Sequence, residues 1–451
     1  MITFARVISV SRSRALMLCA LASLAACGGG GGTSQGGTPP LVTAPVITSQ
    51  PAAATVSVGS AATFSVTATG SAPLTYQWQL STDSGATWSS APGSATSVSY
   101  STSAATIAYD GYRYRVQVSN SAGTTTSNAA LLRVNAGSSP PSVERQINAT
   151  STDSSITAAP STGEAPHVAI NPSASVSAQG KLLVFLPGTQ GRPTQYTFIL
   201  RAAAIRGFHA VGVNYPNQTA MGALCQNSSD PDCYWTARNE VIFGGGIPVS
   251  GQSAVTKADS IVNRLYKMLL WLKTNHASEG WGQFLLANDT VDWSKVVLAG
   301  HSQGGGHVGV LAKTVALSRA VYFSSPDDWH APTDMPANWT VTRPNVTPSN
   351  QQYGFGSDND TLVPNAHAFA HWDGLGLYKP ASGPVLVDGT TSPFSDSHRF
   401  RTMQQYNPAS TAPTPGLRDH GVTVVDTATP VDSAGKPLFD SNGVWAYLCF
   451  Q

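Results

Sequence analysis

The stretch KVVLAGHSQG, residues 295–304, runs from a series of apolar residues into a turn with glycines two positions before and two positions after a serine. Small residues that open a helix follow it, so the pattern predicts a buried strand, a tight turn and a helix. Such a turn presents the Ser302 hydroxyl at the top of a sheet. Gly300 and Gly304 are required because strand and helix come too close there for a Cβ atom.

In this context the motif G-x-S-x-G resembles the nucleophile elbow of the α/β-hydrolase family. The resemblance implies an α/β-hydrolase fold with a mostly parallel sheet over residues 165–451, in which Ser302 is the nucleophile. Strand patterns lie at 167–170, 181–186, 210–214, 320–324, 352–356 and 384–388, and helical patterns lie at 194–209 and 258–275. Their alternation favours a largely parallel sheet.

A second motif overlaps the first one. Residues 304–309, GGGHVG, fit the dinucleotide-binding pattern G-x-G-x-x-G, and Asp327 lies near the distance at which that pattern places a ribose-binding acid. A dinucleotide site needs its glycines in the turn itself, and that turn is already used by residues 301–303. We therefore expect these glycines inside the helix, where they allow close packing on the sheet.

A serine nucleophile needs a base, and the base needs an orienting acid, in the family's chain order Ser, acid, His. The segment GSDNDTLVP, residues 356–364, resembles the family's acid turn, which assigns the acid to Asp360, with Asp358 as the alternative. For the base we favour His420, because a turn residue followed by glycine can point into a cleft. His398 is the alternative, and it begins an alternating stretch that suits a strand.

The oxyanion of the reaction needs preorganised N–H donors. The resemblance implies that one is the N–H of Gln303, the residue after the nucleophile, and that the other comes from a loop after an earlier strand. The segment LPGTQG, residues 186–191, fits that loop. Thr189 or Gln190 would supply the N–H, and we assign it to Gln190.

Residues 45–134 read as short strands separated by turn signals, with alternation at Phe64 and Val66. This segment resembles an immunoglobulin-like β-sandwich, in which Trp78 matches the buried tryptophan and Tyr114 matches the tyrosine corner. The two cysteine positions of the family hold Val66 and Val116, so hydrophobic packing must replace the disulfide. Residues 135–164 are rich in Pro, Ser and Thr and are expected to form a linker.

Residues 1–26 read as a signal peptide, with three arginines before a short apolar core. The sequence around Cys27 resembles a bacterial lipobox, which implies lipidation of that cysteine. Residues 27–44 form a Gly/Ser/Pro tether. We therefore expect an exported protein held by lipid at a bacterial membrane, most naturally the outer one, facing the periplasm or the cell surface; an ordinary secretory signal is the alternative.

In an oxidising compartment, Cys225 and Cys233 are expected to pair and close the loop between them, while Cys449 remains as a buried thiol. The histidines at 367 and 371 share a helix face, but Ala368 stands where H-E-x-x-H has its glutamate. We therefore expect no metal there, and no cofactor.

Charged residues are only 11% of the chain, and the net charge is +1. That composition offers no basic field for nucleic acid. We expect a serine hydrolase that cleaves a carboxylic ester, and lipid and polymeric esters both fit this expectation. The alternative is a surface binding or adhesion protein that uses its sandwich and carries a degenerate hydrolase domain. The substrate and the oligomeric state stay open.

Overall fold

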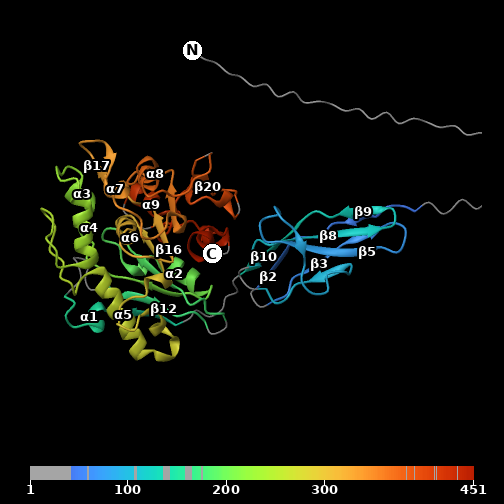
Figure 1. Cartoon of the computed structure of the whole chain (residues 1–451), viewed down its shortest axis with the longest axis horizontal. Coiled ribbons are helices and arrows are strands. Elements are labelled where there is room, and N and C mark those ends of the chain that lie inside the picture. Colours follow the sequence, from blue (N-terminus) through green and yellow to red (C-terminus); the bar gives the residue numbers. More distant parts are fainter. Residues whose placement is uncertain are drawn as a thin grey trace, which may run out of the picture.

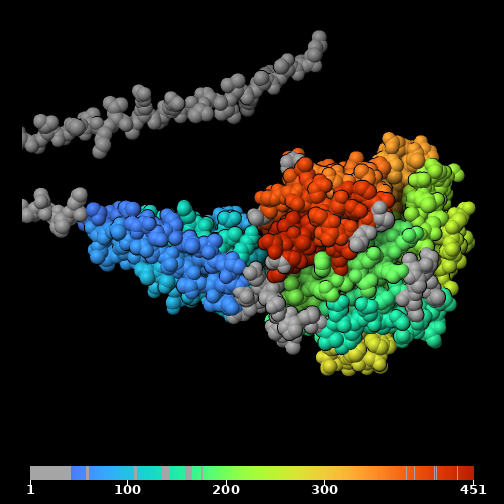
Figure 2. Space-filling model, turned by 180° about the vertical axis from the view of Figure 1, so that it is seen from behind, coloured from blue at the N-terminus to red at the C-terminus, as the bar shows by residue number. Residues whose placement is uncertain are grey.

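The computed structural model describes residues 42–57, 60–105, 109–135, 143–157, 165–173, 176–381, 383–390, 392–410, 412, 414–433 and 435–451. These residues form two domains, an all-β sandwich followed by a larger α/β domain (Figure 1). Figure 2 shows the sandwich as a narrow lobe against the C-terminal part of the larger domain. The predicted signal peptide, Cys27 and the tether up to residue 41 lie outside the described residues.

The sandwich is built from ten short strands among the described residues. They are β1 (Val46–Ser49), β2 (Ala54–Ser57), β3 (Thr63–Ser65), β4 (Thr67–Thr69), β5 (Thr75–Ser81), β6 (Ser89–Ser90), β7 (Ser99–Ser101), β8 (Arg113–Asn120), β9 (Gly123–Thr126) and β10 (Ala130–Asn135). The main sheet has the order β2-β10-β8-β5-β6 with β9 paired to β8, and the pairs β1-β4 and β3-β7 pack against it.

The core of the sandwich is aromatic. Trp78 and Tyr114 are buried on the adjacent strands β5 and β8, and the Tyr114 ring stacks on Phe64 with 4.7 Å between centroids. Val66 and Val116 are buried in the same cluster. Two packed valines therefore stand at the positions where immunoglobulin domains carry their cysteine pair.

One mixed sheet organises the α/β domain. Its strands, in spatial order, are β11 (Glu144–Ile147), β12 (His167–Ile170), β14 (His209–Gly212), β13 (Leu182–Leu186), β15 (Val296–His301), β16 (Arg319–Phe323), β19 (Gln352–Ser357), β21 (Arg399–Thr402) and β20 (Val385–Leu386). The seven strands from β14 to β20 are mutually parallel, whereas β11 and β12 run antiparallel to their neighbours. The prediction of a mostly parallel sheet agrees with this arrangement.

Alternate side chains of the central strands enter two separate cores. On β13, Leu182, Val184 and Leu186 face one cluster, while Leu183 and Phe185 face the other. The helices are α1 (Ala149–Thr152), α2 (Thr197–Ala204), α3 (Met221–Cys225), α4 (Cys233–Phe243), α5 (Ile261–Asn275), α6 (Gln303–Ala312), α7 (Trp339–Thr342), α8 (Asn365–Gly374), α9 (Pro415–Gly421) and α10 (Leu438–Ser441). Helices α4, α5 and α6 cover the first face and α2 the second, so the central strands are buried on both sides.

Three sequence-based boundaries need correction. The predicted linker 135–164 contains β11, which pairs with β12, and α1, which packs on α5, so the α/β domain begins before residue 165. The helix predicted at 194–209 is the shorter α2. The strand predicted at 384–388 is only the two-residue β20. In sequence order the last strand of the sheet is β21, which follows β20 in the chain but lies between β19 and β20 in the sheet.

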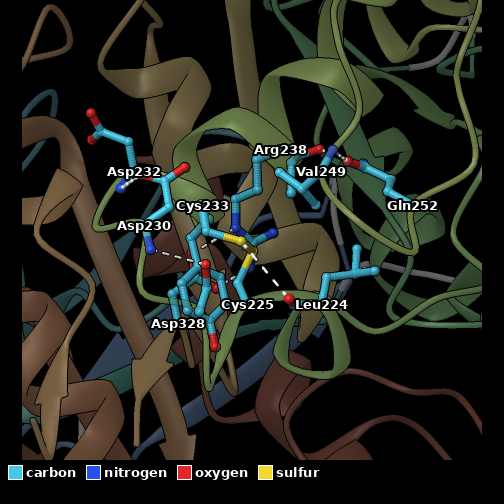
Figure 3. Close-up of a disulfide and its surroundings, with 12 residues drawn as sticks. Leu224, Cys225, Asp230, Asp232, Cys233, Arg238, Val249, Gln252 and Asp328 are labelled. Carbon is cyan, nitrogen blue, oxygen red and sulfur yellow. Dashed lines mark hydrogen bonds and ion pairs between the residues drawn. A yellow bond between two sulfur atoms is a disulfide. The ribbon is translucent and has the colours of Figure 1, made fainter. Parts of the chain in front are cut away.

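The predicted disulfide is confirmed. Cys225 at the end of α3 is bonded to Cys233 at the start of α4, with 5.6 Å between their Cα atoms (Figure 3). Cys449 is a buried free thiol, as expected, and burial raises its pKa to about 12. Among the described helices, none has the length and apolar character needed to cross a bilayer.

Candidate active site

Ser302 sits on a strained turn between β15 and α6. Its φ of 54° and ψ of −120° lie in a region that residues with a side chain rarely adopt. A Cβ atom on Gly300 would lie 2.5 Å from the Gly304 carbonyl carbon, and one on Gly304 would collide with the main-chain oxygen of Leu186. Both glycines are therefore needed for the close approach that the sequence predicted.

The remaining glycines of the overlapping motif lie inside α6 and not in a turn. A Cβ on Gly305 would collide with the Ser325 side chain, and one on Gly309 would lie 2.6 Å from the Trp339 ring. These glycines let the helix pack closely against its neighbours, which is the role expected for them.

The structure brings Asp360 and His420 together. Asp360 follows β19, and its Oδ2 atom lies 2.7 Å from Nδ1 of His420. Its Oδ1 atom accepts hydrogen bonds from the N–H groups of Leu362 and Val363, both at 2.9 Å. The side chains of Asp360 and His420 are buried, at 1% and 8% exposure respectively. The carboxylate is thus fixed by the turn and aligned with the imidazole.

His420 lies in the last turn of α9, and not in an open loop as its sequence suggested. The alternative residues lie elsewhere. Asp358 forms an ion pair with Arg401. His398 lies against the main-chain oxygen of Gln352, 3.1 Å from its Nδ1, and its ring stacks on Tyr353. Neither Asp358 nor His398 is brought to Ser302.

The loop after β13 lies directly over Ser302, because a Cβ on Gly188 would be 3.1 Å from Cβ of Ser302. The assignment of Gln190 as an oxyanion donor is wrong, since its N–H donates to the carbonyl of Asn217 at 2.9 Å. Within the described residues, the N–H of Thr189 has no such acceptor. The Thr189 hydroxyl donates to Oε1 of Gln303 at 2.7 Å, which ties the loop to the start of α6.

Ser302, Gln303 and His420 line one cavity of about 530 Å³. An apolar wall is formed by Met221 from α3 and by Leu362, Val363, Leu417 and Val425. Besides Ser302, Gln303 and His420, the polar lining residues are Thr189, Gln190, Gln195, Tyr196, Arg238, His301, Asp327 and Thr427. A site of this size and mixed lining suits a small organic group held beside Ser302.

Sequence reasoning missed Arg238. This buried residue of α4 forms a bidentate ion pair with Asp328, and its Nη1 atom donates to the carbonyl of Gln303 at 2.9 Å. Figure 3 shows Arg238 close to the disulfide and directed at Asp328. The guanidinium also occupies the space that a Cβ on Gly306 would take. Arg238 thus joins α4, which begins at the disulfide-bonded Cys233, to the start of α6, and no local sequence pattern indicates this contact.

Asp327 also lines the cavity, and its Oδ1 lies 2.8 Å from Nδ1 of His367. Burial raises the pKa of Asp327, and the neighbouring His367 opposes that shift. His367 stacks on Trp329 with 3.7 Å between ring centroids, and Nδ1 of His371 lies 2.7 Å from the His367 carbonyl. The two histidines considered as a metal pair are therefore engaged with these protein groups.

No family model matches this chain. A stretch of 95 residues, 21% of the chain, is 41% identical to endoglucanase C of Cellulomonas fimi, and it spans only 8% of that protein. Among solved structures, immunoglobulin domains 1–5 of Sidekick-1 match 21% of this chain and 20% of theirs, at 20% identity and a TM-score of 0.18. The titin fragment I67–I69 matches 23% of this chain and 35% of its own, at 23% identity and a TM-score of 0.17. TM-scores this low do not establish a shared fold. The assignment of an all-β sandwich is therefore based on the strand pairing of this chain itself.

Proposed function

We propose that the second domain is a serine hydrolase of the α/β-hydrolase type that cleaves carboxylic esters through an acyl-enzyme. The observation that carries this proposal is the 2.7 Å contact between Asp360 and His420, because His420 lines the same cavity as Ser302. The strained backbone of Ser302 supports it, because such strain is typical of a nucleophile held on a strand-to-helix turn.

In this mechanism Asp360 holds His420 with its proton on Nδ1, which leaves Nε2 free to act as the base. Nε2 takes the proton of Ser302 as Oγ attacks the ester carbonyl. The same proton then passes to the leaving alcohol, and the acyl group stays on Oγ. A water molecule, deprotonated in turn by His420, then attacks the acyl carbon. The bond from that carbon to Oγ breaks, the acid leaves, and His420 returns the proton to Oγ of Ser302. The N–H groups of Gln303 and Thr189 face the developing oxyanion in this proposal.

The apolar wall suits the acyl part of the substrate. Leu362 and Leu417 line the cavity and are 47% and 43% exposed, so the apolar surface continues to its rim. We infer an ester with an apolar acyl group, which includes lipid and polyester substrates. No step in the mechanism calls for a cofactor.

A fluorophosphonate probe tests the proposal, because only an activated serine reacts with it. The full-length protein should be labelled and should hydrolyse p-nitrophenyl esters, and Ser302→Ala should do neither. Esters of increasing acyl length would then define the depth of the cavity. Hydrolysis without labelling, or labelling that survives Ser302→Ala, would place the active group elsewhere.

A second candidate function is surface or carbohydrate binding. The stretch that is 41% identical to endoglucanase C supports it, since its 95 residues are comparable in length to the sandwich. Co-sedimentation of the Ser302→Ala protein with insoluble polysaccharides tests binding apart from catalysis. Retention that disappears when residues 45–134 are deleted would assign the binding to the sandwich.

We further propose that the protein is exported and held at a membrane by lipid on Cys27. The lipobox-like sequence and the oxidised Cys225–Cys233 pair support this location. A lipid anchor would bring the cavity to substrates at the cell surface or in the periplasm.

A further inference from the structure

His301, the residue before the proposed nucleophile, is buried and engaged at both ring nitrogens. Its Nδ1 atom lies 3.0 Å from Oη of Tyr196, and its Nε2 atom lies 3.0 Å from the main-chain oxygen of His420. The two imidazole rings are 4.5 Å apart between centroids. His301 therefore contacts the main chain of the proposed base.

The partners fix where the protons lie. A carbonyl oxygen only accepts, so the proton of the His301 ring is on Nε2 and is donated to His420. The Tyr196 oxygen accepts the N–H of Gly188 at 3.2 Å and donates its own proton to Nδ1 of His301. Burial lowers the pKa of His301 to about 3, which keeps the ring neutral and this pattern unchanged at working pH.

Three parts of the site meet at this side chain. Gly188 belongs to the loop that lies over the nucleophile, and a Cβ there would be 3.0 Å from Nδ1 of His301. His301 itself ends β15 and sets the position of Ser302. Buried hydrogen bonds thus connect Gly188, Tyr196, His301 and His420 in that order. They link the loop of residues 186–191, called the oxyanion loop below, with the turn at Ser302 and with the proposed base.

We propose that His301 and Tyr196 are positioning residues that hold the main chain of His420 and the oxyanion loop in register with Ser302. This inference rests on the proposed function. A displacement of the base by about 1 Å can lower the rate roughly 10²-fold, so loss of the bonds should reduce kcat and leave KM little changed.

Two substitutions of His301 separate its two bonds. In His301→Gln the side-chain amide reaches as far as the imidazole Nε2, so it can still donate to the His420 carbonyl. In His301→Asn the amide reaches only the Nδ1 position, and the bond to His420 is lost. His301→Gln should therefore keep several times more kcat than His301→Asn.

Tyr196→Phe removes the hydroxyl that joins Gly188 to His301. The matched control is Tyr322→Phe on β16, which removes another buried hydroxyl. That hydroxyl donates to Oε1 of Gln352 at 2.6 Å. We expect kcat to fall about 10-fold or more in Tyr196→Phe and in His301→Asn, per fluorophosphonate-reactive site. The control should show no such fall, even if both tyrosine variants lose thermal stability.

The inference is overturned if Tyr196→Phe matches the control in kcat, or if His301→Asn and His301→Gln are equal. A loss of Tm with normal kcat per reactive site would show a structural role only, and also overturns it. Failure of the proposed function is a separate result, because it would appear as activity that persists in Ser302→Ala.

Discussion

Asp360 and His420 are 60 positions apart in the sequence, and 2.7 Å separates the Asp360 Oδ2 atom from the His420 Nδ1 atom. Asp360 is placed by the turn after β19. This strand lies beside β16, and β16 is the neighbour of β15, the strand that leads into Ser302. The carboxyl ends of parallel strands meet at one edge of a sheet. The parallel order therefore brings this acid to the edge where Ser302 stands, and α9 delivers the histidine to it.

Ser302→Ala and His420→Ala should each lower kcat/KM for a p-nitrophenyl ester roughly 10³-fold or more, because members of a catalytic triad act as a unit. His398→Ala is the control, since its ring lies against Tyr353 and away from the cavity. Its kcat per folded molecule should stay close to that of the unchanged protein. The reverse ranking of the two histidine variants would transfer the base to His398.

The sequence was sufficient to predict the turn around Ser302, the glycines that it needs and the disulfide, because each depends on a short local pattern. It was insufficient for the oxyanion donor. The N–H of Gln190 donates to the carbonyl of Asn217, in a loop where Gln190 adopts a φ of 57°. The order of side chains in the sequence does not reveal a backbone direction of this kind.

Long-range pairing explains the other differences. β11 is a short edge strand with a polar sequence, and it is recognised only through its antiparallel pairing with β12. Arg238 and His301 also take their roles from distant partners, Asp328 and the main chain of His420. Residues of this type carry no periodicity that would set them apart from core residues.

Arg238→Met should lower the free energy of unfolding by about 3–5 kcal/mol, because it leaves the buried Asp328 carboxylate without its cation. Adding Asp328→Asn removes that buried charge and should recover part of the loss. Urea unfolding of the two single variants and the double variant measures the coupling between them. Additive losses would contradict the interpretation of this ion pair as one buried unit.

Acid should destabilise the protein through His167, whose pKa is lowered to about 3 by burial first and the Arg264 charge second. In the unfolded chain its pKa is about 6.5, so between these values the unfolded state binds the extra proton. The contribution of neutral His167 to the free energy of unfolding is complete above a pH of about 6.5, and it is lost as the pH falls toward about 3.

His167→Asn removes this titration, and its Oδ1 can still accept the N–H of Asn214, now bonded to Nδ1 at 3.0 Å. In that variant the acid slope of the unfolding free energy should be shallower by up to about 1.4 kcal/mol per pH unit. Denaturant unfolding at several pH values measures it, and identical slopes would contradict the assignment.

Cys27→Ser should release the protein from membrane fractions, because a lipidated Cys27 is the anchor that the sequence suggests. Fractionation of cells that express each form decides this, with Ser302→Ala as a control that keeps Cys27. Equal distribution of Cys27→Ser and the unchanged protein would exclude lipid attachment as the cause of membrane binding.

Deletion of residues 45–134 should leave turnover of a small soluble ester nearly unchanged. Ser302, Asp360 and His420 all belong to the α/β domain, whose sheet begins with β11 after the deleted range. Between the domains, the hydroxyl of Ser84 donates to the carbonyl of Ser392 at 2.7 Å, and the described lining of the cavity at Ser302 includes no sandwich residue.

The same deletion should reduce hydrolysis of a polymeric or surface-bound ester, because a bound sandwich raises the effective concentration of the active site at that surface. Initial rates on a soluble p-nitrophenyl ester and on an insoluble polyester, measured with equal numbers of fluorophosphonate-reactive sites, separate the two effects. A ratio of polymer to small-ester activity that stays the same after deletion would mean that the sandwich does not deliver the enzyme to its substrate. An equal and large loss on both would mean that the α/β domain needs the sandwich to fold.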